Sequence, residues 1–177
     1  MARTFKRSRH AEGLDVVLEA GEAAVLTRLC AELTTLLDRD NDDDGDGDGE
    51  SKADPVLERL FPRAYLDPTE EDAEADWQRF SHGDLMDGRR RAVSTVEETL
   101  ARATARRGRL ELKLSEDEAQ AWLAVINDAR LALGTRLEVT EDMDMSRLDA
   151  DDPDTAPYAV YWWLGVLEER LIEVLSG

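Results

Sequence analysis

Apolar side chains recur at helical spacing along much of the chain, and this repeat constrains the fold more than any other feature. The clearest stripe consists of Val160, Leu164, Leu167, Leu171 and Val174. Residues three and four positions apart lie on one face of a helix, so this spacing predicts a helix that buries that face. Further helices are predicted over 19–37, 54–60, 69–107 (interrupted or bent at two glycines, Gly83 and Gly88) and 115–134.

Short alternating segments predict a small β-sheet beside these helices. Residues 3–7 and 14–18 flank a turn that contains Gly13, which is typical of a β-hairpin. Residues 110–114 alternate leucine with charged residues and predict a third strand with one apolar face. The expected fold class is therefore mainly α, with four to five helices and a small three-stranded, antiparallel-type sheet.

Two acidic segments separate the predicted helices. The run from Asp38 to Glu50 is mostly acidic and contains three glycines. Like charges repel one another and glycine has a high backbone entropy, so a disordered loop is expected at about 38–53. A second acidic loop is expected at about 138–156, before the last helix. The length of the chain fits a single domain over residues 1–177 with these two loops.

The first acidic run partly matches a calcium-binding loop. Asp40, Asp42 and Asp44, followed by Gly45, have the spacing of the first half of an EF-hand. The twelfth position, which should supply a bidentate glutamate, is Ser51. A solvated acidic loop is favoured over a calcium site, and neither a metal nor a cofactor is predicted.

Charge restricts the partners of the chain. With 22 basic and 41 acidic side chains, the net charge is −19, which repels nucleic acid at long range and attracts basic partners. The first residues have no apolar run of the kind a secretory signal needs, and no stretch is long enough to span a membrane. A cytoplasmic protein without a membrane segment is expected.

Residues of the kind that carry catalysis are few. The chain has two histidines and one cysteine, and it lacks a phosphate-binding loop, a dinucleotide fingerprint and a nucleophile elbow. These observations predict a protein that is not an enzyme. Cys30 could be a redox sensor, but it falls on a leucine stripe, where a buried thiol behaves as a small hydrophobic group.

Arginines gather in short clusters against this acidic background. If such clusters converge on one face, they could contact phosphates, which keeps a direct DNA-binding regulator as an alternative. Otherwise they are solvated or paired with the many carboxylates. The phosphate-contact candidates are Arg89, Arg90, Arg91, Arg106, Arg107 and Arg109.

Polar and aromatic residues of the last two helices are candidates for partner binding. Tyr161, Trp162 and Trp163 cannot all point one way, because adjacent helical residues diverge by about 100°. Some of these rings belong to the core, and the remainder could form a binding hot spot. Polar residues within the helix over 115–134 and just after it either form internal hydrogen bonds or contact a partner. The partner-binding candidates are Arg130, Arg136, Asn127, Asp128 and Trp163.

The same region carries a family resemblance. The resemblance is densest at Ala121-Trp122-Leu123 and from Asn127 to Arg136, and it extends to Tyr158-x-x-Tyr161-Trp162-Trp163-Leu164, Phe5-Lys6-Arg7 and the segment from Leu57 to Tyr65. In these stretches the chain resembles an actinobacterial family, long catalogued as a domain of unknown function and labelled actinomycete oxidative-stress regulator (AosR). The similarity covers nearly the whole chain apart from the acidic loops.

The resemblance implies a cytosolic regulator of transcription under oxidative stress. It implies contact with a sigma factor or RNA polymerase, and an encoding gene near that of a Clp protease adaptor. A pair of cysteines would be one way to sense oxidation, and this chain departs from that pattern because it has only Cys30. A switch here would need an intermolecular disulfide, a capped thiol or methionine oxidation.

Together these observations predict a non-enzymatic regulatory protein that binds a sigma factor or RNA polymerase. The alternatives are direct DNA binding, an adaptor for the Clp protease, and a binder of small ligands. A homo-oligomer is left open.

Overall fold

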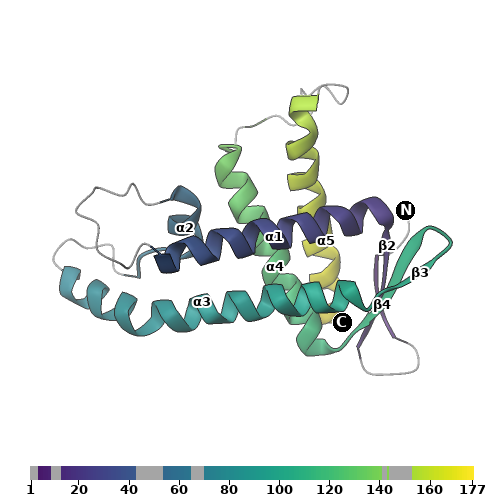
Figure 1. Cartoon of the computed structure of the whole chain (residues 1–177), viewed down its shortest axis with the longest axis horizontal. Coiled ribbons are helices and arrows are strands. Elements are labelled where there is room, and N and C mark those ends of the chain that lie inside the picture. Colours follow the sequence, from purple (N-terminus) through teal and green to yellow (C-terminus); the bar gives the residue numbers. More distant parts are fainter. Residues whose placement is uncertain (1–3, 9–12, 43–53, 65–69, 141–142, 144–152) are drawn as a thin grey trace.

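The computed structural model describes residues 4–8, 13–42, 54–64, 70–140, 143 and 153–177. The parts of the predicted acidic loops at 43–53, 141–142 and 144–152 lie outside the described residues. Within the described part the protein is mainly helical, with a small antiparallel sheet at one end (Figure 1).

Five α-helices and one short 3₁₀ helix are present in the described residues. They are α1 (Ala20–Asp42), α2 (Pro55–Leu60), α3 (Glu71–Ala101), α4 (Glu116–Arg136), the 3₁₀ helix η3 (Pro153–Thr155) and α5 (Ala156–Ser176). The predicted caps are confirmed at α2, where Asp54 accepts a hydrogen bond from the backbone N–H of Val56 at 2.8 Å, and at α4. There Ser115 and Glu118 form a capping box.

Two sequence-based helix boundaries differ from the structure. α1 continues through Asp42, past Asp38, where the acidic run begins. α3 runs without a break through Gly83 and Gly88, although each glycine lowers helix propensity by about 1 kcal/mol relative to alanine. Packing of α3 against α1 and α4 outweighs this local cost.

The sheet has four strands in the order β1-β2-β4-β3, all antiparallel, so the three-strand prediction is one strand short. β1 (Phe5–Arg7), β2 (Leu14–Glu19) and β4 (Arg109–Leu114) are the predicted strands. β3 (Thr104–Arg106) lies where the sequence predicts the end of a helix. All three of its residues are exposed and carry no apolar alternation, so the sequence has no strand pattern there. It forms a hairpin with β4.

α4 is the central element of the core. It packs against α2, α3 and α5, and Trp122 is fully buried in its middle. The Trp122 indole Nε1 donates to Thr99 Oγ1 at 2.8 Å, so the buried polar group is satisfied, and Phe5 meets the ring edge-on at 6.2 Å. In Figure 1, α1 and α3 run along the molecule, and α4 and α5 cross behind them.

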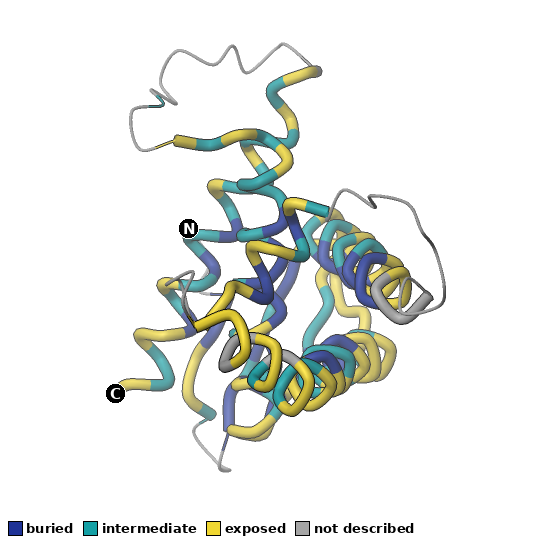
Figure 2. Tube along the Cα trace, turned by 90° about the vertical axis from the view of Figure 1, so that its left-hand side faces the viewer, coloured by how far each residue is buried: buried dark blue, intermediate teal, exposed yellow. Residues whose placement is uncertain are grey.

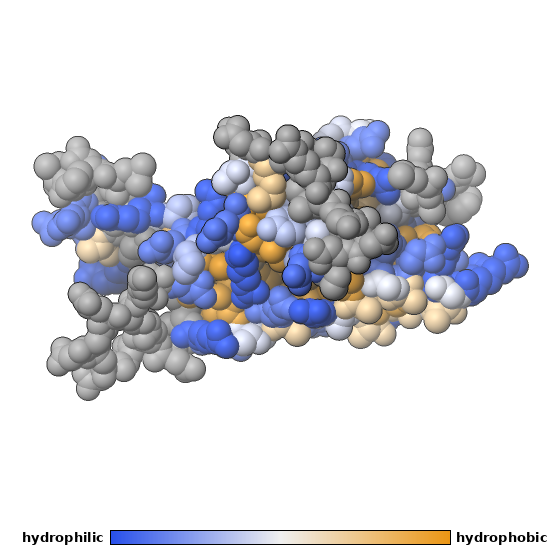
Figure 3. Space-filling view, turned by 90° about the horizontal axis from the view of Figure 1, so that it is seen from above, coloured by the Kyte–Doolittle hydropathy of each residue, from blue (hydrophilic) through white to orange (hydrophobic). Residues whose placement is uncertain are grey.

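The helices bury the stripes that the sequence indicates. Ala23, Leu26, Cys30, Leu33 and Leu37 line the inner face of α1. Figure 2 looks along α1 and α3, whose buried residues face the rest of the molecule while exposed residues lie on the outside. Seen from above in Figure 3, hydrophilic side chains cover much of the surface, with hydrophobic atoms showing between them near the middle.

Candidate partner-binding groove between α4 and α5

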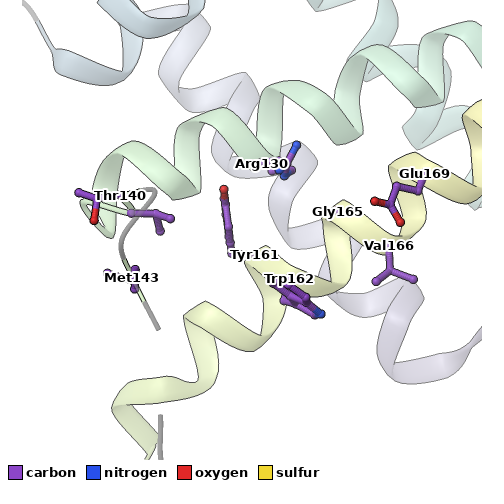
Figure 4. A pocket seen from close by; sticks show the side chains of 9 residues that line it. Arg130, Thr140, Met143, Tyr161, Trp162, Gly165, Val166 and Glu169 are labelled. Carbon is purple, nitrogen blue, oxygen red and sulfur yellow. The ribbon is translucent and has the colours of Figure 1, made fainter. Parts of the chain in front are cut away.

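A groove lies between α4 and α5, with a hollow of about 320 Å³ (Figure 4). The two helices are joined by the second acidic segment and pack closely side by side. The hollow is lined by Arg130, Val139, Thr140, Met143, Tyr161, Trp162, Gly165, Val166 and Glu169.

Arg130 and Tyr161 hold the two helices of the groove together. Arg130 Nη1 donates to Glu168 Oε2 at 2.9 Å, and its guanidinium lies 5.4 Å from the centre of the Tyr161 ring. Tyr161 projects from α5 toward α4 in Figure 4. A methyl group on Gly134 would lie 2.9 Å from this ring, so glycine is required for the close approach. The groove is therefore a preformed surface.

Trp162 is the prominent apolar residue at the edge of this groove. Its side chain is 62% exposed, whereas Leu164 on the inner face of α5 is fully buried. In Figure 4, Trp162 and Val166 lie on the same side of α5. An exposed tryptophan beside a hollow is a typical hot-spot arrangement at protein interfaces.

The sequence-based candidate Trp163 lies elsewhere. Its indole Nε1 donates to Glu22 Oε1 at 3.3 Å, so this ring joins α5 to α1. Trp163 stands four residues before Leu167 and therefore shares the buried stripe, while Trp162 does not. Counting from the stripe identifies Trp162 as the outward ring, a signal that is present in the sequence.

The polar candidates on α4 do not form one surface. Asp128 is buried and forms an ion pair with Arg89 of α3, and the neighbouring Asn127 is half-buried. Burial raises the pKa of Asp128, against the opposing effect of Arg89. Arg136 faces α1, where it donates to Glu32 at 3.3 Å beside another hollow. Of the five candidates, Arg130 alone lines the groove.

The arginine cluster on α3 is mostly turned inward. Arg89 donates to the carbonyl oxygen of Leu60 at 2.7 Å, and Arg90 donates to that of Leu37 at 2.6 Å. Both side chains thereby join α3 to neighbouring helices. Arg91 is exposed and forms no ion pair with the described part of the chain.

The second arginine cluster lies at the far end of the molecule, on the β3–β4 hairpin (Figure 1). Arg109 Nε donates to Glu19 at 2.8 Å, and Arg106 lies 3.7 Å from Glu111. Arg107 occupies the hairpin turn at φ 53°, in the left-handed region, and has no ionic partner among the described residues. The two clusters therefore belong to different parts of the fold.

Cys30 lies in the core of α1 with no exposed surface. Burial, with a smaller effect of Glu97, raises the pKa of its thiol to about 12. The reactive form of cysteine is the thiolate, which is scarce at neutral pH with such a pKa. The environment of Cys30 is that of an inert core residue.

The described residues contain no group of three or more histidine, cysteine, aspartate or glutamate side chains arranged to hold a metal ion. The incomplete EF-hand pattern extends beyond residue 42 and lies largely outside the described residues. Among the described helices, none is both long enough and apolar enough to cross a membrane.

Comparison with known proteins places the chain in a family. The model of the family described as Domain of unknown function (DUF2017) matches residues 2–175. This chain belongs to that family. The match to this family model confirms the resemblance carried by the sequence of α4 and α5.

Relatives in mycobacteria carry a functional name. Proteins named "Oxidative stress regulator AosR" from Mycobacterium tuberculosis (strain ATCC 25618 / H37Rv) and Mycobacterium bovis are 34% identical to this chain over 178 residues. The match covers 88% of this chain and 79% of each relative. A "Putative oxidative stress regulator AosR" from Mycobacterium leprae is 35% identical over 135 residues, covering 70% of this chain and 59% of that protein. No solved structure matches the chain.

Proposed function

We propose that this protein is a non-enzymatic regulator of the oxidative-stress response that acts by binding a sigma factor or RNA polymerase. The regulatory part of this proposal is supported by the names of the relatives. The protein-binding part is supported by one structural observation, the 62% exposed Trp162 beside the hollow between α4 and α5. Binding a partner over this indole would remove a large apolar surface from water, and tryptophan is enriched at interface hot spots.

Direct DNA binding is the second candidate, and the hairpin arginines Arg106 and Arg107 are the observation that favours it. The rest of the charge distribution opposes it, because Arg89 and Arg90 form internal hydrogen bonds and the net charge is −19. Protein contact is therefore the function that the geometry supports best.

The proposal is tested with purified components. RNA polymerase core and individual sigma factors from an actinobacterium are mixed with the protein and with Trp162→Ala, and complexes are separated by size-exclusion chromatography. Phe80→Ala is the matched control, because Phe80 is 69% exposed on α3, away from the groove. The expected result is a complex that Trp162→Ala weakens at least tenfold and Phe80→Ala leaves intact.

Three results would contradict the proposal. The first is the absence of a complex with every component. The second is a complex that forms equally with both variants, which would keep the partner but contradict the role of Trp162 in binding it. The third is binding to duplex DNA alone that is abolished by Arg106→Ala/Arg107→Ala, which would transfer the function to the hairpin.

A further inference from the structure

We infer that the groove between α4 and α5 binds a basic amphipathic helix of a partner protein, with one bulky apolar side chain inserted beside Trp162. This inference deepens the proposed function and rests on it only in taking the partner to be a protein. Four observations carry it: the shape of the surface, the distribution of apolar groups, the lining of the hollow and the unpaired charge.

The outer face of α5 presents a continuous stripe. Trp162, Val166, Glu169 and Glu173 are separated by four, three and four residues, so they line one side of the helix. The eleven residue steps from Trp162 to Glu173 rise about 16 Å, or three turns. A surface of that length matches a helix of similar length better than a single side chain or a small ligand.

The stripe changes character along its length. Trp162 and Val166 form an apolar end beside the hollow, and the exposed Glu169 and Glu173 form an acidic end. A matching partner helix therefore carries an apolar anchor toward one end and lysine or arginine toward the other. The two ends together fix the direction in which the helix lies.

The hollow suits an apolar anchor. Its volume of about 320 Å³ is ample for a leucine or aromatic side chain, and Val139, Met143 and Tyr161 contribute apolar lining. Methionine adapts its shape readily, so Met143 can adjust to anchors of different form. These properties favour a large apolar side chain as the occupant.

The charges around the groove determine the charge expected of the partner helix. Arg130 is the one cation that lines the groove in the described part of the chain, and it is already paired with Glu168 and stacked on Tyr161. Glu138, Glu169 and Glu173 are exposed and have no ionic partner among the described residues. A basic helix neutralises these carboxylates, whereas an acidic helix adds to a net charge of −19.

The apolar contact is tested with two fluorescein-labelled, 20-residue helical peptides that share a leucine face and carry either lysine or glutamate elsewhere. Fluorescence anisotropy is expected to show binding of the lysine peptide, with at least tenfold lower affinity for Trp162→Ala. Phe80→Ala should leave the affinity unchanged. Equal binding of the two peptides, equal effects of the two variants, or no binding at millimolar concentration would overturn the inference.

The charge contact is tested with the same lysine peptide. Glu169→Gln/Glu173→Gln is expected to lower the affinity of this peptide and to flatten the salt dependence of its binding. The reason is that two carboxylates that attract the lysines of the peptide are lost. The control Glu71→Gln/Asp72→Asn removes the same charge from exposed positions at the start of α3. If both double variants weaken binding equally, the peptide is held by net charge rather than by the groove, and the inference fails.

Two further outcomes separate this inference from the proposed function. Specific peptide binding without a complex with the transcription machinery would keep the groove and remove that partner. A polymerase complex that is insensitive to Trp162→Ala would keep that partner and rule out the groove as its binding site. If sedimentation shows a dimer that Trp162→Ala dissociates, a second copy of this chain occupies the groove and the basic helix is ruled out.

Discussion

Asp128→Ala is expected to destabilise the fold by about 3 kcal/mol, because it leaves the guanidinium of Arg89 without its carboxylate. Asp128 of α4 has a side chain that is 7% exposed, and that of Arg89 on α3 is 25% exposed. The same guanidinium donates to the carbonyl oxygen of Leu60 and lies 5.0 Å from the centre of the Phe61 ring. One side chain thus links α3 to α4 and to the end of α2.

The magnitude follows from this geometry. Removing one partner of a buried ion pair costs about 3–5 kcal/mol, and the partial exposure of Arg89 places this site at the lower end. Replacing both partners with apolar groups is often neutral, so Arg89→Met/Asp128→Leu is expected to lie within about 1 kcal/mol of the native protein. The exposed pair Arg28–Glu32 is the control, and Arg28→Ala should cost less than about 0.5 kcal/mol.

Urea unfolding followed by circular dichroism measures these differences as shifts in midpoint at constant slope. In a heating experiment, 3 kcal/mol corresponds to a fall in Tm of about 6–12 °C for a chain of this size. A loss below about 1 kcal/mol for Asp128→Ala would refute the role of the ion pair. So would a double variant as unstable as Asp128→Ala, because the loss would then arise from packing rather than from an unpaired cation.

Three further predictions concern single positions. Gly88→Ala on α3 should raise stability by about 1 kcal/mol, since an added methyl group meets nothing within 4 Å. Gly134→Ala should bring no gain, because its methyl group would meet the Tyr161 ring. The midpoints of urea unfolding compare the two variants. Arg107→Asn should raise stability by about 1 kcal/mol by relieving the left-handed backbone of the hairpin turn, and Arg107→Ala, which keeps that cost, should not. The hydrogen bond from Arg102 lowers the pKa of Glu118 from its ordinary value of 4.5. The stability that this hydrogen bond contributes is therefore present above pH 4.5 and is lost as the pH falls through the lowered pKa. Glu118→Gln should therefore reduce the loss of stability on acidification, and an unchanged pH profile of the urea midpoint would contradict this.

Much of the fold could be predicted because helix and strand periodicities are local. The stripe Leu164, Leu167 and Leu171 predicts α5, and the residues flanking Gly13 predict β1 and β2. β3 could not be predicted, since an exposed edge strand of three residues has no apolar pattern to distinguish it. The continuity of α3 through Gly88 was equally hidden, because tertiary packing overrides the local preference of glycine.

The candidate site was predictable only in part. Arg130 was among the sequence-based candidates and lines the groove, whereas Trp163 packs against α1 and the exposed ring is Trp162. The stripe of α5 contains the information needed to choose between the two rings. It does not tell which neighbouring helices cover the other faces of α5, so the groove between α4 and α5 could not be predicted from it.

The sequence by itself determined the helical class, the caps of α2 and α4, the acidic surface and the buried environment of Cys30, because each depends on residues close along the chain. Only the tertiary structure decided that Asp128 pairs with Arg89, that Arg90 binds the Leu37 carbonyl of α1, and that a groove opens between α4 and α5. Long polar side chains can reach several partners, and the partner they take depends on which helices meet. That choice is made by packing across the whole core rather than by any local pattern.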